Sequence, residues 1–346
     1  MSMNAIQDTI AGKAAPAEVR PRQLATFGNI SLAITLGLLL IAPLFMKNFV
    51  IFQMTMVLIY GLAVLALNIL TGASGQFSLG HSAFYAIGAY TTAILMEFGG
   101  VNYLLTLPVA GIVCFIVGFL FGFPALRLSG IYLALATFAL AVAMPQLLKI
   151  GAFEHWTGGV QGLVITKPDA PFGLPISQDM WLYYLALAIS VLIYIASVNL
   201  LGSRSGRAMM AIRDNQIAAS AMGIDVSFYK TVAFGISAGI TGIAGGLGAI
   251  AVQFVAPDGY TFQLAIALFL GMVVGGVGWL PGSLAGAAFI VFVPNIAESI
   301  SKGLSGAVFG VLLLVIIFVV PHGARQAAVL LQNSLAKLKK TTGGKP

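Results

Sequence analysis

The side chains that could carry out catalysis or hold a metal are few and scattered along this chain of 346 residues. The histidines are His81, His155 and His322, and no cysteine accompanies them at the spacing of a metal site. The sequence contains no G-x-x-x-x-G-K-[ST] phosphate loop, and no serine, histidine and acid stand out as a catalytic triad. It therefore predicts a protein that is not an enzyme and that carries neither a metal nor a cofactor.

The composition indicates where the chain lies. Hydrophobic residues make up 59% of it and charged residues only 8%, and its mean hydropathy is +1.01. Soluble domains carry roughly a quarter charged residues, whereas a helix that crosses a bilayer needs about 20 mostly apolar residues. We therefore expect an all-α integral membrane protein with about ten transmembrane helices. The expected spans are 27–46, 49–70, 82–96, 103–123, 131–148, 181–200, 231–254, 263–278, 284–297 and 305–320.

None of these spans contains Asp, Glu, Lys or Arg. Proton- or ion-coupled carriers usually keep buried charges as relays despite their cost, and here only His81 comes near that description. A histidine beside a glycine-rich segment is more often a hydrogen-bonded structural residue. If the chain transports a solute, we therefore expect the energy to come from a partner protein. Cys114, the single cysteine, lies within a span and is expected to be a small buried hydrophobe.

The basic residues orient the chain. With the N-terminus in the cytoplasm, 13 of the 17 Lys and Arg residues fall inside, and Lys47, Lys149, Lys167 and Lys302 fall outside. This asymmetry obeys the positive-inside rule and predicts that both termini are cytoplasmic. The net charge of +7 therefore reflects topology and not binding to nucleic acid. The first apolar run exceeds an ordinary signal-peptide core, so we expect it to be retained.

Polar stretches set the expected domain limits. Cytoplasmic tails at 1–26 and 323–346 flank a transmembrane domain at 27–322. An external loop at 149–180 and a cytoplasmic loop at 201–230 leave the membrane. The C-terminal tail could form an amphipathic helix on the membrane lipid.

Two glycine-rich segments join expected spans: "TGASGQFSLGH" (71–81, the first joint) and "GGVGWLPGS" (275–283, the second joint). Backbone that is interrupted at membrane depth must be covered by protein or line a water-filled cavity. Paired glycine-broken segments point to a transport pathway. The alternative is that both joints are tight turns between helices. Many other glycines lie four residues apart, which predicts close packing between helices.

The cytoplasmic loop contains a polar, alanine-rich stretch. From Ser205 to Met222 it predicts one helix, because only Gly206 near the start opposes helix formation. Gly223 suits the left-handed position that ends a helix. Such a helix could dock in a groove of another protein or lie on the membrane surface, held by its arginines. The residues expected to share one face are Ala208, Ala211, Ile212, Asn215, Ala218, Ala219 and Met222.

Five stretches together resemble a known family. "GRAMMAIRDNQIAASAMGID" (206–225) is similar to the coupling-loop motif of ABC importer permeases of the branched-chain amino acid class, although Gln216 stands where Glu is common. The other four are "LNILTGASGQFSLGHSAFYAIGAY" (67–90), "ALRLSGIYLALATFA" (125–139), "TGGVQGL" (157–163) and "GGVGWLPGSLAGA" (275–287). In order and spacing they resemble the LivM-type permease subunit, from about residue 50 to 320.

The resemblance implies a permease of a bacterial inner membrane that imports branched-chain or related small amino acids. It implies a second, homologous permease subunit, two cytoplasmic ABC ATPase subunits and an external (periplasmic) solute-binding protein. A urea or short-chain amide permease of the same family would look nearly the same. A stand-alone channel or secondary carrier is the alternative from another class, which the missing intramembrane carboxylates disfavour.

These expectations name three groups of site residues. The residues expected to couple to the ATPase are Arg213, Asn215, Gln216, Ala218, Ala219 and Gly223. The residues expected to line the translocation path, with neutral hydrogen-bonding groups, are Gln76, Ser78, His81 and Ser82. The binding protein is expected to dock at Gly158, Gly159 and Gly162, unless that loop is a plain turn-rich connector.

Overall fold

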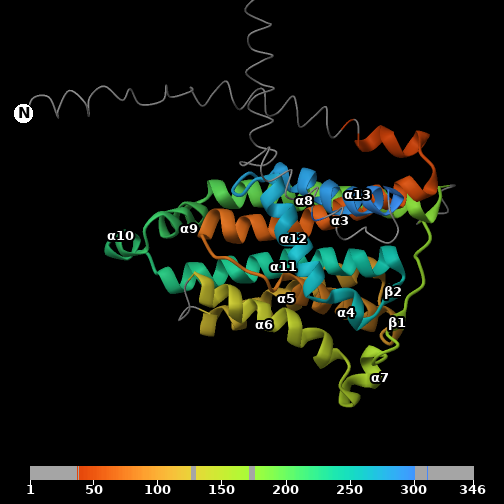
Figure 1. Ribbon diagram of the computed structural model, residues 1–346, viewed down its shortest axis with the longest axis horizontal. Coiled ribbons are helices and arrows are strands. Elements are labelled where there is room, and N and C mark those ends of the chain that lie inside the picture. Colours follow the sequence, from red (N-terminus) through yellow and green to blue (C-terminus); the bar gives the residue numbers. More distant parts are fainter. Residues whose placement is uncertain (1–36, 38, 126–129, 171–175, 301–309, 311–346) are drawn as a thin grey trace, which may run out of the picture. The chain divides into compact units, whose positions relative to one another are not determined.

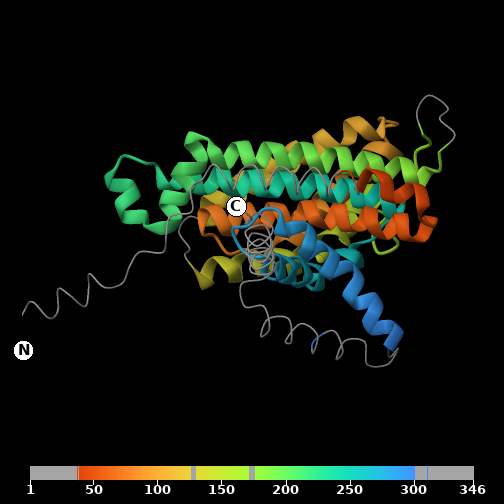
Figure 2. The same cartoon turned by 90° about the horizontal axis from the view of Figure 1, so that it is seen from above.

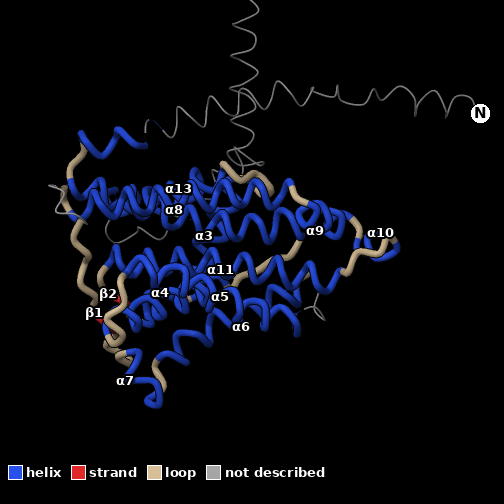
Figure 3. Tube along the Cα trace, turned by 180° about the vertical axis from the view of Figure 1, so that it is seen from behind, coloured by secondary structure: helices blue, strands red, loops and turns tan. Residues whose placement is uncertain are grey.

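The computed structural model describes residues 37, 39–125, 130–170, 176–300 and 310. Regular structure in these residues is helical apart from two strands of two residues each, as Figure 3 shows. The elements are η1 (Ala42–Phe45), α3 (Asn48–Asn68), the π-helix η2 (Ile69–Ala73), α4 (His81–Glu97), α5 (Tyr103–Ala125), α6 (Ile131–Leu148), η3 (Gly151–Phe153), α7 (Glu154–Thr157), β1 (Leu163–Val164), α8 (Gln178–Gly202), α9 (Arg204–Asp214), α10 (Gln216–Ala221), α11 (Val226–Val252), β2 (Phe254–Val255), η5 (Pro257–Tyr260), α12 (Phe262–Gly275) and α13 (Gly282–Ile300).

Contacts divide the chain into two units, residues 1–47 and residues 48–346. The described part of the first unit holds the short 3₁₀-helix η1. The other elements, α3 to α13, belong to the second unit, and the candidate site is built from them. The expected tails, 1–26 and 323–346, lie outside the described residues.

Six helices in the described part are long and apolar enough to cross a membrane, and Gly282–Glu298 is a shorter apolar helix. The chain is therefore an all-α, multi-pass membrane protein, but ten is not the number of spans that the structure supports. Of the expected span 27–46 the structure describes residue 37 and residues 39–46, and of the expected span 305–320 it describes residue 310 alone. The expected span 82–96 corresponds to α4, which has only 17 residues because it begins inside the bundle. The six helices are Asn48–Ala73, Tyr103–Pro124, Ile131–Leu148, Gln178–Gly202, Val226–Val252 and Pro257–Gly275.

The glycine-rich helix α11 is the centre of the second unit, because it packs against α5, α4 and α3. Glycine permits this close approach. A Cβ added to Gly88 of α4 would lie 2.0 Å from the carbonyl oxygen of Gly242 in α11, and one added to Gly118 of α5 would lie 2.3 Å from Cβ of Ala238. Where a hydrophobic force between helices is lacking, such small faces hold helices together by close contact. The packing role predicted for glycines four residues apart is confirmed at Gly118 and Gly242, and Gly88 adds a contact that the spacing did not predict.

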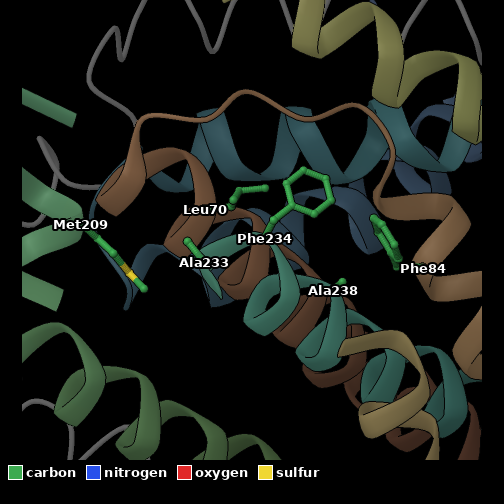
Figure 4. Close-up of a cluster of buried hydrophobic side chains, with 6 residues drawn as sticks. All are labelled: Leu70, Phe84, Met209, Ala233, Phe234 and Ala238. Carbon is green, nitrogen blue, oxygen red and sulfur yellow. The ribbon is translucent and has the colours of Figure 1, made fainter. Parts of the chain in front are cut away.

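One polar element is anchored in the bundle by a buried cluster (Figure 4). We call α9 and α10 together the arm (residues 204–221). Met209 of the arm is fully buried, and it shares this cluster with Leu70, Phe84 and Phe234 of η2, α4 and α11. The arm leaves one end of the long helices, while α7 and the β1–β2 pair lie at the opposite end (Figures 1 and 2). We call these the arm end and the sheet end.

Candidate functional site

The arm consists of two helices, so the prediction of one continuous helix over 205–222 is wrong. Asn215 has an extended backbone between α9 and α10, with φ −158° and ψ 107°. Its side-chain oxygen accepts hydrogen bonds from the backbone N–H groups of Ile217 and Ala218, each 3.0 Å long. Asparagine is among the best N-cap residues, and here the gain from capping a new helix outweighs continuation of the old one. The chain therefore turns at Asn215.

This turn also divides the face that was expected to be shared. Ala208 and Ile212 of α9 are buried against the bundle, and Ala219 of α10 is only 3% exposed. The large apolar side chains left open on the arm and directly after it are Ile217 and Met222, which are 82% and 83% exposed. Ala208 and Ala219 are therefore covered by the protein itself, whereas Ala218 stays exposed beside Ile217, and the exposed isoleucine and methionine are what a partner could cover.

The end of α10 has the geometry predicted for Gly223. Its φ is +81°, in the left-handed region, and its N–H donates to the carbonyl of Ser220 at 3.0 Å. The N–H of Ile224 donates to the carbonyl of Ala219 at 3.1 Å, which completes a Schellman motif. Asp225 then caps α11 by accepting from the N–H of Phe228 at 3.0 Å. The arm is thus joined to α11 by a tight, fully bonded connection.

Arg213, the last arginine of α9, points toward the first joint. Its Nη1 donates to the carbonyl oxygen of Gly72 at 2.6 Å, and its Nε and Nη2 contact Asp214 at 2.9 and 2.8 Å. Its aliphatic stem lies beside Gly75, where an added Cβ would come within 2.9 Å of Cγ of Arg213. The guanidinium remains partly exposed. One of the residues expected to couple to the ATPase therefore contacts the bundle itself.

The first joint is a break inside the bundle, and the tight-turn interpretation does not hold for it. The π-helix η2 ends at Ala73, and residues 76–80 run without helical structure to the start of α4. Side chain Nε2 of Gln76 donates to the carbonyl of Lys230, whereas His81 contacts Ser237, seven residues further along α11. At 1.5 Å per residue the segment therefore descends about 10 Å along α11 before α4 begins.

The backbone of this break is satisfied by neighbouring side chains. Thr71 Oγ1 donates to the carbonyl of Gln76 at 3.1 Å, and Ser74 Oγ donates to that of Leu70 at 2.7 Å. The N–H of Leu79 donates to Oγ1 of Thr137 in α6 at 2.9 Å. Irregular backbone at membrane depth is tolerated only where such partners cover it. Of the two expected kinds of cover, protein or a water-filled cavity, the bonds named here come from the protein.

His81 is held in a hydrogen-bonded chain. The hydroxyl of Ser237 donates to the carbonyl of Ala66 at 2.7 Å, so His81 Nε2, also 2.7 Å from that hydroxyl, must be the donor of their contact. Nδ1 of His81 then accepts from the hydroxyl of Ser78 at 3.1 Å. This arrangement requires a neutral imidazole with its proton on Nε2. His81 is therefore a structural residue that ties α4 to α11 and α3.

The four residues expected to line a path are all buried in this unit. Gln76, Ser78 and His81 spend their hydrogen bonds on the protein, since Gln76 Nε2 donates to both Ser74 Oγ and the Lys230 carbonyl at 3.0 Å. Ser82 differs from them, because its fully buried hydroxyl has no hydrogen-bond partner among the described residues.

The second joint is a tight turn between α12 and α13, as the alternative interpretation held, and it lies directly against the first joint. A Cβ on Gly72 would be 2.7 Å from Cα of Gly278. The residue that joins the two is Asn68, at the end of α3, whose side chain is 1% exposed. Its Nδ2 donates to the carbonyls of Gly276 and Trp279 at 3.2 and 3.1 Å, and its Oδ1 accepts from the N–H of Gly278 at 2.6 Å.

At the sheet end, the glycines of "TGGVQGL" serve the loop itself. All three have positive φ: +69° at Gly158, +56° at Gly159 and +73° at Gly162. A Cβ on Gly158 would lie 2.1 Å from the carbonyl of Gly162, and one on Gly162 would lie 2.3 Å from that of Val255. β1 then pairs with β2 in an antiparallel register, Leu163 opposite Val255. The loop is therefore ordered, and residues beside the glycines, such as Val160, form its exposed surface.

Sequence reasoning missed Asn68 and Ile217. A polar amide at the end of an otherwise apolar run was the available signal for Asn68, but its partners are more than 200 residues away. For Ile217, the signal was an isoleucine two residues after an N-cap asparagine, which the assumption of one helix concealed. In the part of the chain that the structure describes, no three His, Cys, Asp or Glu side chains are grouped so as to hold a metal ion.

Comparison with known proteins identifies one family of membrane permeases. The profile of the family described as branched-chain amino acid transport system / permease component matches residues 49–319. The high-affinity branched-chain amino acid transport system permease proteins LivM of Salmonella typhimurium and Escherichia coli are 36% and 35% identical to the chain over 247 residues. Each alignment covers 65% of this chain and 58% of the relative, so the chain spans less than two thirds of their length.

A relative with another cargo in its name also matches. The autoinducer 2 import system permease protein LsrC of Enterobacter sp. (strain 638) is 30% identical over 155 residues, which is 42% of this chain and 43% of that protein. No solved structure matches the chain.

Proposed function

The chain belongs to the branched-chain amino acid transport system permease family, and on this premise we propose that it is the membrane-spanning subunit of an ABC importer. Its cargo would be branched-chain or related small amino acids, by analogy with the two LivM relatives. The likeness to the autoinducer 2 import system permease LsrC supports an importer whose cargo is not set by the permease family alone. The binding protein that delivers the cargo would therefore select it.

The importer would contain a second, homologous permease, two cytoplasmic ATPases and an external solute-binding protein. The observation that carries this proposal is the arm end. Ile217 and Met222 are exposed there on a short helix, while the helix before it is fixed in the core by Met209. Large apolar side chains clustered on a rigid polar element suit insertion into a groove of another protein. The arm would occupy the groove of the ATPase.

The membrane topology follows from the same assignment. We propose ten spans, including 27–46 and 305–320, in the bacterial inner membrane, with the arm end and both termini in the cytoplasm. The asymmetry of 13 basic residues against 4 supports this orientation. The sheet end would then face the binding protein, which would contact the surface around Gly158, Gly159 and Gly162. The first joint would border the path, with Ser82 the residue whose hydroxyl remains available.

Reconstitution of the complete transporter tests the function. Proteoliposomes containing both permeases and both ATPases, with ATP at the ATPase face and the binding protein at the other, should accumulate radiolabelled leucine, isoleucine or valine. Uptake should stop without ATP or without the binding protein. Equal flux in the absence of ATP would contradict the proposal and identify a channel or secondary carrier. ATP-dependent uptake of urea or an amide, without amino acid uptake, would change the cargo and keep the mechanism.

Labelling at the two ends tests the topology. Val160→Cys at the sheet end and Met222→Cys at the arm end both replace strongly exposed side chains. In a Cys114→Ser background, an impermeant thiol reagent outside spheroplasts should modify position 160 and leave position 222 unmodified. The reverse pattern in spheroplasts would overturn the orientation.

A further inference from the structure

The arm, the first joint and the second joint are connected in series by two side chains. The first connection is Arg213, which donates to the carbonyl of Gly72 at 2.6 Å and packs its stem on Gly75. A charged donor on a backbone carbonyl makes a stronger hydrogen bond than a neutral one. Gly75 has φ +70° and so leaves room for that stem. The arm is therefore attached to the turn that ends the long α3 helix.

The second connection is Asn68. It uses both of its N–H donors and one acceptor position on backbone groups of residues 276–279. Burying an amide in an apolar environment is unfavourable unless it is bonded, and this one is bonded only to the second joint. Its partners are backbone atoms, so it fixes where the joint lies and not which side chains the joint carries. Gly72 lies between, against both Gly278 and Asn68.

No comparable link reaches the joints from the other basic residues of α9 that the structure describes. Arg207, two turns before Arg213, donates to the carbonyl of Gly202 at 2.8 Å, within its own local turn. Residue Asn295 of α13 likewise donates to the carbonyl of Val291, four residues earlier. Both are exposed. The Arg207 bond reaches only the last residue of α8, five residues earlier, and the Asn295 bond stays within α13, so neither bond reaches a joint. The chain thus supplies a matched control for each connecting residue.

We infer that Arg213 and Asn68 are positioning residues that make the arm and both glycine joints move as one body. A displacement of the arm then displaces the first and the second joint together. This inference rests on the proposed function, in which the arm receives the motion of the ATPase. Arg213 would then act inside the subunit, and Ile217 and Met222 would make the contacts with the ATPase. Loss of either connecting residue leaves the ATPase bound but separates its cycle from the joints.

The complete transporter in nanodiscs gives the first test. The measured quantity is the ratio of ATPase activity with loaded binding protein to the activity without it. Arg213→Ala and Asn68→Ala should each lower this ratio about tenfold, the effect of losing a hydrogen bond to or from a charged or buried group, with basal activity and assembly retained. Arg207→Ala and Asn295→Ala should leave it unchanged. Arg213→Lys, which keeps a charged donor, should restore part of it.

The double variant Arg213→Ala/Asn68→Ala distinguishes a series from two separate effects. Because either replacement breaks the same connection, the double variant should lower the stimulation ratio no further than the more affected single variant does. Losses that multiply would overturn the inference, and so would full stimulation in Arg213→Ala. Arg213 is partly exposed, so its replacement is not expected to prevent folding even if Asn68→Ala does.

A distance measurement tests the connection independently of cargo. Spin labels at Met222, the residue directly after the arm, and at Val277 on the second joint, both exposed, should keep one narrow distance distribution with and without nucleotide. The Arg213→Ala variant should broaden or shift that distribution in one nucleotide state. Two distances in the unaltered transporter, or one unchanged distance in the variant, would refute the inference. A transporter without any stimulated ATPase activity would instead refute the proposed function and leave this measurement valid.

Discussion

The 149–165 loop at the sheet end and the arm at the opposite end are both polar excursions from an apolar bundle, yet they are completed differently. The loop closes on its own chain through the β1–β2 pair, and the glycine at 162 fits against the carbonyl of Val255. The arm is followed by Gly223, which also has positive φ but has nothing within 4 Å of an added Cβ. The subunit itself completes the first excursion, whereas the second leaves large apolar side chains, Ile217 and Met222, uncovered.

The largest expected effect comes from testing the closed excursion. Gly162→Ala places a methyl group 2.3 Å from a backbone carbonyl at φ +73° and should cost about 2–5 kcal/mol of unfolding free energy. Gly223→Ala, at φ +81° in open space, should cost only about 1–2 kcal/mol. Thermal unfolding of the purified subunit in detergent measures both. Equal losses of unfolding free energy would contradict the view that the loop is closed on its own chain at Gly162 and that the chain is open at Gly223.

A second prediction concerns the open surface of the arm. Ile217→Ser should weaken binding of the ATPase by about tenfold or more, because an exposed apolar anchor that becomes buried in an interface contributes about 2 kcal/mol. The control is Val164→Ser, at an apolar residue of the sheet end that is also strongly exposed. It should leave ATPase affinity unchanged. Affinity can be measured by titrating labelled ATPase onto the permease pair in nanodiscs, and equal effects of the two variants would remove the distinction between the ends.

Ala218→Leu separates an ATPase groove from a membrane surface. Ala218 is exposed and Ala219 is buried, so only the first reports on a partner without disturbing the subunit. In a packed groove the added methylenes should cost about 1–3 kcal/mol and lower stimulated ATPase activity. On lipid, a leucine would only deepen the seat of the helix. Full stimulation in this variant would favour the membrane-surface alternative.

The smallest effect is expected at the ion pair that joins the 149–165 loop to η5. Lys149 Nζ lies 2.6 Å from Asp258, with the aspartate well exposed. Pairs in such surroundings contribute about 0.2–1 kcal/mol, so Lys149→Ala should barely change the unfolding temperature, and high salt should reduce the difference further. A loss as large as that from Gly162→Ala would mean that the loop is held by charge and not by its backbone.

Local chemistry was predictable from the sequence, and long-range pairing was not. The left-handed Gly223 depends on residues within one turn, and the helix-packing glycines depend on small size alone. The break at Asn215 arises because its side-chain amide caps a new helix, α10, more favourably than the chain continues α9. The periodicity of the sequence alone predicted one continuous helix. The meeting of the two joints through Asn68 depends on the arrangement of α3, α12 and α13, which no local pattern contains.

The π-helical turn at Ile69–Ala73 has a consequence for how the end of α3 could be rearranged. A π turn is an α-helix that holds one residue more than its path requires. Passing that surplus residue along the chain would rotate everything beyond it by about 100° and shift it by about 1.5 Å, while most of its backbone bonds re-form in a new register. The end of α3 therefore holds one residue that could be moved along the helix. The carbonyl of Gly72, which accepts the hydrogen bond from Arg213, belongs to this π-helical turn.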